Sequence, residues 1–289
     1  MKILLATDGS ESAEQAIRWF SRLPIAHGPS VEVLTVSSYQ VYAVVPPKVH
    51  DELVRLEREH AFESFQRAAK ILQEVGIEAV QVTCLGQPAD EITRYAKESQ
   101  TDLIVVGAHG MSLVEHMLIG STSETVARHA PCSVLLVRTK KPQNSKSGEL
   151  SNITVASDCS DADRQIAAQV NALGVSKDTK FSLISVMEQP YLLEPVYEYS
   201  AQLKGETTLA LDRLAKELAA NSDHIEKHVF EKLHVASCIL NFIRTHPTDI
   251  VVVGDRGRSA IGRFFLGSVS GVLLQHSPCS VLLLRKRSE

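Results

Sequence analysis

Short apolar runs rich in β-branched residues alternate along the chain with longer segments of helical period. In the first half these runs predict strands near 3–6, 31–36, 78–82, 103–106 and 134–137. Between them apolar residues recur every three or four positions, as in Ala13, Ala16, Ile17 and Phe20, and the segment 49–75 predicts a long helix. Strict alternation of strand and helix predicts a parallel sheet with right-handed crossovers and helices on both faces.

The second half of the chain repeats the first. The segment APCSVLLVR at 130–138 recurs as SPCSVLLLR at 277–285, and TDLIVVGAHG at 101–110 recurs as TDIVVVGDRG at 248–257. The repeat predicts two doubly wound α/β domains, each with a five-stranded parallel sheet, at residues 1–138 and 152–289. Residues 139–151 are polar, without apolar periodicity, and predict a flexible linker.

Composition and charge limit the class of protein. A length of 289 residues with 44% hydrophobic and 22% charged residues is typical of a globular protein. The net charge of -4 is too balanced for a protein that wraps nucleic acid, so we expect no such partner. No apolar run approaches the ~20 residues of a membrane span, and the apolar run after Lys2 is too short for a signal peptide. We therefore expect a cytoplasmic protein without membrane contact.

Glycine-rich loops follow the fourth predicted strand of each half. The spacing G-x2-G-x9-G-S occurs twice, as Gly107, Gly110, Gly120 and Ser121 and as Gly254, Gly257, Gly267 and Ser268. In a doubly wound sheet, ligands bind outside the carboxyl ends of the strands where the strand order reverses. Glycines let backbone amides approach an oxyanion, and a helix N-terminus favours negative charge. A tight strand-to-helix turn is the alternative for one glycine pair, but the spacing in both copies favours phosphate binding.

These residues resemble the universal stress proteins in their tandem form, whose ATP-binding subgroup carries the motif G-x2-G-x9-G-[ST]. The resemblance covers nearly the whole chain apart from the linker and implies an adenine nucleotide alpha hydrolase-like fold. It implies ATP as the ligand and leaves open whether Mg²⁺ accompanies it. Asp8 and Asp158 would face the ribose and adenine. Four valines would contact the base or sugar, namely Val36, Val106, Val186 and Val253.

By the same resemblance the loops after strand four would hold the ribose and phosphates. The residues implied are Gly107, Gly110, Gly120, Ser121 and Thr122 in the first copy and Gly254, Gly257, Gly267, Ser268 and Val269 in the second. His109 lies inside the first loop and is either a phosphate contact or an ordinary loop residue. Arg256 replaces it in the second copy, where added positive charge favours a triphosphate.

The second copy departs from the first at the turn after its first strand. Cys159 stands where the first copy has Gly9, which removes a residue that reaches positive φ at little cost. Ser160 and Asp163 form the S-x-x-D pattern of a capping box. A helix N-terminus lowers the pKa of a thiol and neighbouring acids raise it, so the reactivity of Cys159 is left open.

The fifth predicted strand of each copy, at 133–137 and 280–284, has no internal charge or proline, and such a strand exposed at a sheet edge would aggregate. By resemblance to dimers of the family, we expect the two strands to pair antiparallel across a pseudo-twofold axis. The chain would then be an intramolecular pseudo-dimer, with further dimerisation left open.

Neither loop shows a Walker G-K-[ST], a G-x-G-x-x-G or an evident pair of general base and nucleophile. No metal site is expected, since the five cysteines include no C-x-x-C. We expect a stress-response protein that binds ATP or a related adenine nucleotide and signals to an unidentified protein partner through occupancy, not an enzyme. The alternatives are a slow ATP hydrolase and an interaction module in which one or both pockets bind no nucleotide.

Overall fold

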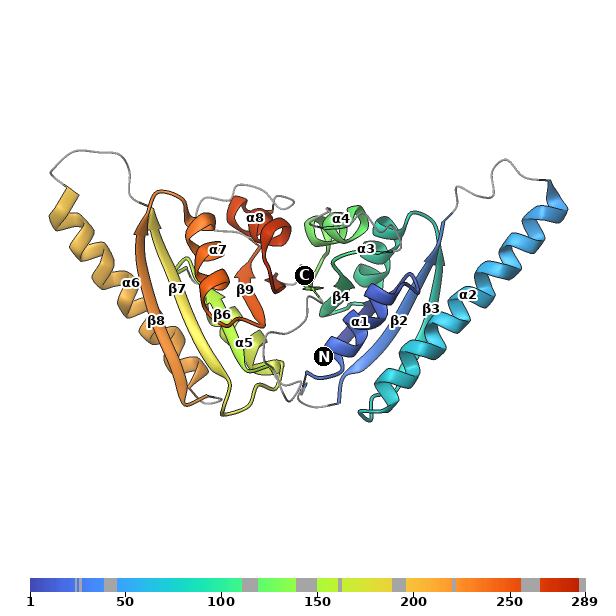
Figure 1. Cartoon of the computed structure of the whole chain (residues 1–289), viewed down its shortest axis with the longest axis horizontal. Helices are drawn as coiled ribbons and strands as arrows, with labels where there is room; N and C mark the ends of the chain where they lie inside the picture. Colours follow the sequence, from blue (N-terminus) through green and yellow to red (C-terminus); the bar gives the residue numbers. More distant parts are fainter. Residues whose placement is uncertain are drawn as a thin grey trace. The chain divides into compact units, whose positions relative to one another are not determined.

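The computed structural model describes residues 1–23, 25, 28–38, 46–110, 119–138, 150–160, 163–188, 196–219, 222–255 and 266–285. The chain forms two compact units, and each is built of alternating strands and helices (Figure 1). This architecture confirms the prediction of two α/β domains. Most of the predicted linker, residues 139–149, lies outside the described residues. The predicted pairing of the two fifth strands stays a prediction.

The first unit is a parallel sheet with its helices in the crossovers. Its elements are β1 (Lys2–Ala6), α1 (Glu11–Phe20), β2 (Ser30–Ser37), α2 (Pro47–Gln73), β3 (Ala79–Leu85), α3 (Pro88–Glu98), β4 (Leu103–Gly107), α4 (Ser121–His129) and β5 (Ser133–Val137). The strand order is β3-β2-β1-β4-β5, and every neighbouring pair in it is parallel. The order reverses between β1 and β4, so the loops after these two strands lie at the switch point.

The second unit repeats this topology. Its elements are β6 (Asn152–Ala156), α5 (Asp163–Ala172), β7 (Lys180–Glu188), α6 (Val196–Leu218), β8 (His224–Lys232), α7 (Val235–Thr245), β9 (Ile250–Gly254), α8 (Ser268–His276) and β10 (Ser280–Leu284). The strand order is β8-β7-β6-β9-β10, again parallel throughout. The corresponding switch point lies between β6 and β9.

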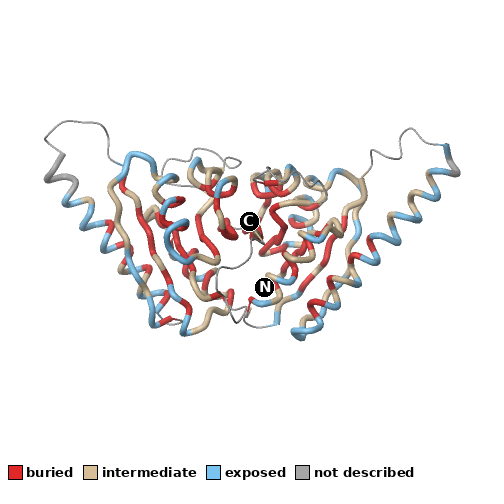
Figure 2. The backbone as a smooth tube through the Cα atoms, viewed as in Figure 1, coloured by how far each residue is buried: buried red, intermediate tan, exposed pale blue. Residues whose placement is uncertain are grey.

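Local sequence explains why these elements begin where they do. The Ser10 hydroxyl accepts the Ala13 amide proton at 3.2 Å and caps α1 at its N-terminus. The predicted apolar face of α1 is buried down to Phe20, which is fully enclosed. Strand β4 is buried along its whole length, as expected for a strand that helices cover on both faces. Figure 2 shows the buried strands at the centre of each sheet.

The helices pack in pairs, α1 with α2 and α3 with α4, and likewise α5 with α6 and α7 with α8. Helix α2 is 27 residues long, and its buried residues all lie in its second half, beginning at Ala61. That half includes Ser64, only 2% exposed, which lies against the loop after β1. Within the described residues, no helix combines the length and apolar character needed to cross a bilayer.

Candidate functional site

The turn after β1 is held by its own side chains. The Thr7 hydroxyl accepts the Gly9 amide proton at 3.1 Å, and Asp8 Oδ1 accepts the Ser10 amide proton at 3.0 Å. Gly9 has a φ of +75°, a conformation that glycine reaches at little cost. The Thr7 amide donates to the Leu34 carbonyl of β2 at 2.9 Å, so the turn starts directly at the sheet edge.

The loop after β4 meets this turn at the switch point. Gly110 passes so close to Asp8 that a Cβ added at Gly110 would lie 2.5 Å from Asp8 Oδ2. Gly107, at the end of β4, is less tightly enclosed: an added Cβ would lie 3.3 Å from the His109 carbonyl and 3.4 Å from the Ser12 carbonyl. The glycines therefore bring the two loops together, with the Asp8 carboxylate directed at the backbone of Gly110.

Helix α4 begins at this loop without a capping side chain. Gly120 is its N-cap, and the first helical hydrogen bond runs from the Glu124 amide to the Gly120 carbonyl at 2.9 Å. The amides of Ser121, Thr122 and Ser123 therefore precede the helical hydrogen bonds, and no side-chain hydrogen bond caps this end within the described residues. Such an end attracts anions, because unused N–H groups and the helix dipole act in the same direction.

Two further hydrogen bonds fix the α4 start against the end of β4. The Gly120 amide donates to the Ala108 carbonyl at 2.7 Å, and the buried Ser123 hydroxyl donates to the Gly107 carbonyl at 2.7 Å. The Ala108 amide donates to the Val137 carbonyl of β5 at 2.8 Å. The start of α4 is therefore held in place by hydrogen bonds to main-chain carbonyls.

The second unit builds the same scaffold. The Gly267 amide donates to the Asp255 carbonyl at 2.8 Å, and the Ser270 hydroxyl donates to the Gly254 carbonyl at 2.6 Å. Gly267 caps α8 without a side-chain hydrogen bond, as Gly120 caps α4. Within the described parts of both copies, a helix start without a side-chain cap therefore lies beside a glycine at the end of the fourth strand.

The model of the universal stress protein family matches the chain twice, at residues 1–138 and 149–285. The chain belongs to the universal stress protein family. The family match confirms the resemblance read from the glycine motif, and we call the two units the first and second domain.

Individual relatives agree with this assignment. Universal stress protein YxiE from Bacillus subtilis is 32% identical over 145 residues, which are 47% of this chain and 98% of that protein. Universal stress protein MJ0531 from Methanocaldococcus jannaschii is 31% identical over 143 residues, 49% of this chain and 83% of that protein. A universal stress protein from Archaeoglobus fulgidus has the same fold over 99% of this chain and 98% of its own, with a TM-score of 0.69 at 22% identity.

The predicted ligand contacts of the first domain gather at the switch point. Asp8 and Gly110 face each other, Gly107 ends β4, and His109 lies between the two glycines. Gly120, Ser121 and Thr122 form the start of α4, and Val36 lies near the end of β2. Val106 lies on β4 and is only 4% exposed.

In the second domain the structure describes most of the predicted contacts. Asp158 follows β6, Val186 lies on β7, and Gly254 ends β9, where Val253 is 6% exposed. Gly267, Ser268 and Val269 form the start of α8. Arg256 and Gly257 lie outside the described residues. As ligand contacts, all these residues of both domains stay predictions.

The turn after β6 differs from its counterpart in the first domain. Cys159 has a φ of +58°, so the cysteine keeps the left-handed turn that Gly9 makes, although it lacks the conformational freedom of glycine. The Cys159 amide donates to the Ser157 hydroxyl at 2.9 Å, as the Gly9 amide does to Thr7. A non-glycine residue in this conformation costs roughly 1–2 kcal/mol, so the surroundings impose the turn.

The predicted capping box between Ser160 and Asp163 is wrong. The Asp163 carboxylate accepts instead from the Ser157 hydroxyl, at 2.9 Å to Oδ1 and 2.8 Å to Oδ2. The Ser160 amide donates to Asp158 Oδ1 at 3.1 Å. Ser157 is buried, so its hydroxyl proton needs an acceptor within the protein, and the Asp163 carboxylate is that acceptor.

Burial changes the acidity of Asp163. The pKa of this carboxyl is raised to about 6, mainly by desolvation and to a smaller extent by the charges of Asp158 and Glu217. The hydrogen bond from Ser157 and the charge of Arg213 act in the opposite direction. Asp163 is therefore ionised at neutral pH but titrates close to it. Nearby, Asp158 Oδ2 is buried without a hydrogen-bond partner within the described residues.

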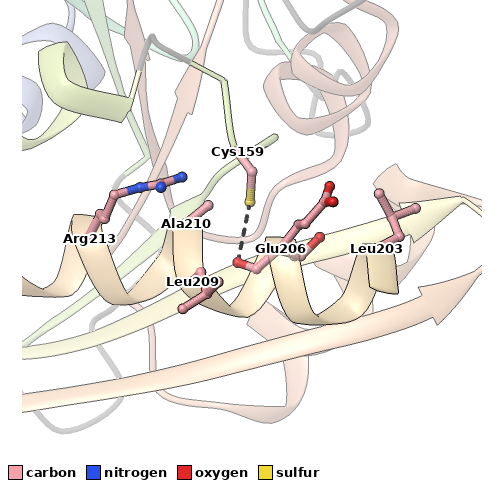
Figure 3. Close-up of a pocket in the computed structure, with 7 residues that line it drawn as sticks. Cys159, Leu203, Glu206, Leu209, Ala210 and Arg213 are labelled. Atoms are coloured by element: carbon pink, nitrogen blue, oxygen red, sulfur yellow. Dashed lines mark hydrogen bonds between the residues drawn. The ribbon is translucent and has the colours of Figure 1, made fainter. Parts of the chain in front are cut away.

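A cavity of about 250 Å³ lies between this turn and α6 (Figure 3). Its lining residues are Cys159, Leu203, Glu206, Thr207, Leu209, Ala210 and Arg213. The Cys159 thiol points at the helix and lies 3.8 Å from the Thr207 carbonyl. In the first domain the matching space is filled, because a Cβ at Gly9 would overlap the Ser64 hydroxyl and lie 2.9 Å from the His60 ring.

Sequence reasoning missed three contributors to these loops. Ser123 and Ser270 brace the helix starts, and their equal spacing from Gly107 and Gly254 is a signal that could have found them. Arg67 of α2 donates to the Gly9 carbonyl at 3.3 Å and pairs with Glu14 at 2.5 Å. No local pattern indicates that contact, because 58 residues separate Arg67 from Gly9.

Proposed function

We propose that this protein binds ATP or a related adenine nucleotide at the carboxyl edges of its sheets, and that it signals through occupancy rather than turnover. The uncapped start of α4 beside the glycine turn, repeated at α8, carries the proposal. Main-chain amides at such a helix start can bind a phosphate whatever the neighbouring side chains are. The motif's resemblance to the ATP-binding subgroup of the family supports adenine as the base.

Each part of the site suits one part of the nucleotide. The amides of Ser121 and Thr122 would bind phosphate oxygens, and the Asp8 carboxylate would accept hydrogen bonds from ribose hydroxyls. Val36 would offer an apolar contact for the base. In the second domain the buried and unpartnered Oδ2 of Asp158 would accept from the ribose in the same way.

The chemistry of these loops favours binding over hydrolysis. Backbone amides stabilise an oxyanion, but they take no proton from an attacking water. Slow hydrolysis stays the alternative in the enzyme class, and phosphate release measured against protein concentration tests it. If the rate of phosphate release is proportional to protein concentration and is abolished by Gly120→Val, the protein is an ATP hydrolase and the proposal of signalling through occupancy is wrong.

One observation favours the interaction module for the second domain. Asp255 stands where the first domain has Ala108, and its carbonyl accepts from the amide of the α8 N-cap Gly267. A carboxylate next to the expected phosphate position would repel a nucleotide unless the arginines that follow in the sequence offset its charge. The alternative of a pocket that binds no nucleotide is therefore stronger for the second domain than for the first.

The direct test is the identity and affinity of the bound small molecule. Purified protein is denatured, the released small molecules are identified by mass spectrometry, and the stripped protein is titrated with ATP by calorimetry. Gly120→Val should abolish binding in the first domain, because a side chain at this position would lie 3.4 Å from the Ala108 carbonyl and cover the helix start.

Gly205→Ala is the matched control, since a Cβ at Gly205 has no heavy atom within 4 Å. It should leave the titration unchanged. A purified protein that carries no small molecule and gives no heat with millimolar ATP would refute nucleotide binding. A Gly120→Val protein that titrates like the wild type at both sites would refute the start of α4 as the binding site.

A further inference from the structure

The two domains hold the turn at the start of their candidate sites by different contacts. In the first domain the turn is clamped from outside: Arg67 of α2 binds the Gly9 carbonyl, Glu14 holds Arg67, and Ser64 packs directly on Gly9. Position 13, one residue before Glu14, is a buried alanine that offers no hydrogen bond from its side chain.

In the second domain the sequence places Asp163 at the position of Ala13 and Arg164 at that of Glu14. The clamp of the first domain therefore cannot be repeated with the same charges. The space beside the turn is also more open, because a cavity is lined by Cys159 and by α6, although the Cys159 thiol still reaches the Thr207 carbonyl of that helix. What holds the turn is a chain of hydrogen bonds that runs from the Cys159 amide to the Ser157 hydroxyl and from that hydroxyl to the Asp163 carboxylate.

We propose that Asp163 is a positioning residue for the nucleotide site of the second domain, and that it acts through Ser157 on the turn that carries Asp158. The proposal rests on the proposed function, because it concerns the geometry of the same site. Asp163 itself touches no ligand in this account.

The direction of the Ser157 proton explains how the carboxylate acts. An ionised carboxylate can only accept, so the Ser157 proton points at Asp163 and the oxygen lone pairs point at the Cys159 amide. A protonated carboxyl can donate to Ser157 instead, which frees the hydroxyl proton to turn toward Cys159 Sγ, 3.7 Å away. The Cys159 amide then shares the Ser157 oxygen with the carboxyl proton as a second donor, so its hydrogen bond weakens and the turn loosens.

Among the residues that the structure describes, three charged groups act on Asp163. Asp158 lies on its own turn, and Arg213 and Glu217 face it from α6. Helix α5 also packs on β9, whose residues are Ile250–Gly254 and carry no charge. Arg213 keeps its charge at every pH of interest, so Asp163, whose pKa lies at about 6, is the group expected to change between pH 7.5 and pH 5.

The test measures ATP affinity in the second domain alone. Gly110→Val silences the first domain in the full chain, because its side chain would displace Asp8. Calorimetry then compares the ATP affinity of the Gly110→Val protein with that of the same protein carrying Asp163→Asn, at pH 7.5 and at pH 5. We expect Asp163→Asn to weaken ATP binding about fivefold at pH 7.5, as for loss of a charged hydrogen bond, and to have almost no effect at pH 5. The titration of ATP itself cancels in the comparison.

Two controls separate positioning from folding. Asp223→Asn makes the same chemical change at an exposed ion pair and should leave affinity unchanged. In a Ser157→Ala background, Asp163→Asn should change affinity less than twofold, because the residue through which it acts is gone. Equal affinity ratios at the two pH values, or an undiminished effect without Ser157, would overturn the proposal.

The failure of the proposal and that of the proposed function have different signatures. If the wild type binds ATP but the Gly110→Val protein does not, the second domain is empty and the positioning role is overturned, while nucleotide binding by the first domain stands. If the wild type itself gives no heat with ATP, the proposed function fails.

Discussion

Asp163→Asn should stabilise the second domain at alkaline pH and do so less at acidic pH. The wild-type carboxyl is buried, and its pKa is raised from the ordinary 3.8 to about 6, with desolvation as the main cause. A folded-state pKa above that of the unfolded chain means that the folded protein binds the proton more tightly. The stability associated with this group is therefore complete below pH 3.8 and is lost as the pH rises through 6.

The size of the effect follows from the same two values. At about 1.4 kcal/mol for each tenfold change in acid dissociation, ionisation of Asp163 costs the folded state about 3 kcal/mol above pH 7. At pH 5 the unfolded chain is already ionised while the folded carboxyl is mostly protonated, so about 1.5 kcal/mol of this cost remains. Asparagine keeps the shape and never ionises, so the stabilisation by Asp163→Asn should be about 1.5 kcal/mol larger at pH 8 than at pH 5.

Urea denaturation at both pH values measures this difference. The asparagine also changes packing and hydrogen bonding to Ser157, but those contributions are the same at both pH values and cancel. The chain has one tryptophan, Trp19 on α1, so its fluorescence follows the first domain and serves as an internal control, while far-UV circular dichroism follows both domains. If the free energy gained by Asp163→Asn is equal at pH 5 and pH 8, the carboxyl is not desolvated and the reasoning is wrong.

Two further predictions concern the glycines of the first domain. Gly110→Ala should weaken ATP binding there about tenfold, because its Cβ would lie 2.5 Å from Asp8 Oδ2 and displace that carboxylate; calorimetry showing unchanged affinity would argue against Asp8 as a ligand contact. Gly9→Ala and Gly28→Ala both place alanine at a positive φ, of +75° and +55°, but only the first also overlaps Ser64. Gly28→Ala should lower the free energy of unfolding, measured by urea denaturation, by roughly 1–2 kcal/mol, and Gly9→Ala should lower it by about 2 kcal/mol more. Equal losses would show that α2 moves aside without a measurable loss of stability.

The fold was predictable because its strongest signals are local and repeated. The segment Leu103–Gly107 is apolar throughout, which is typical of a central parallel strand, and it forms β4 with every residue buried. The long helix expected over 49–75 is α2 at Pro47–Gln73. The helix starts at Gly120 and Gly267 follow from the spacing of the glycines, which needs no knowledge of distant contacts.

The contacts that distinguish the two sites were not predictable in the same way. Asp163 can reach either the Ser160 amide or the Ser157 hydroxyl, and the sequence pattern favours the first. Burial decides for the second, because the hydroxyl of Ser157 is enclosed and needs an acceptor within the protein. Arg67 reaches Gly9 only because α2 returns across the turn, which is a property of the folded chain.

Comparison of the two copies separates two structural tasks within one site: fixing the helix start and fixing the turn after the first strand. In both domains the helix start is fixed by bonds from a glycine amide and a serine hydroxyl to main-chain carbonyls, and these bonds tolerate the change from Ala108 to Asp255 because only the carbonyl takes part. The turn that carries Asp8 or Asp158 is fixed by side chains, and the contacts differ: Arg67 donates to the Gly9 carbonyl in the first domain, and Asp163 accepts from Ser157 in the second. An arginine stays charged throughout the physiological range, whereas a carboxyl that titrates near pH 6 does not. If both sites take the same ligand, the second is the one whose occupancy should follow cellular acidification.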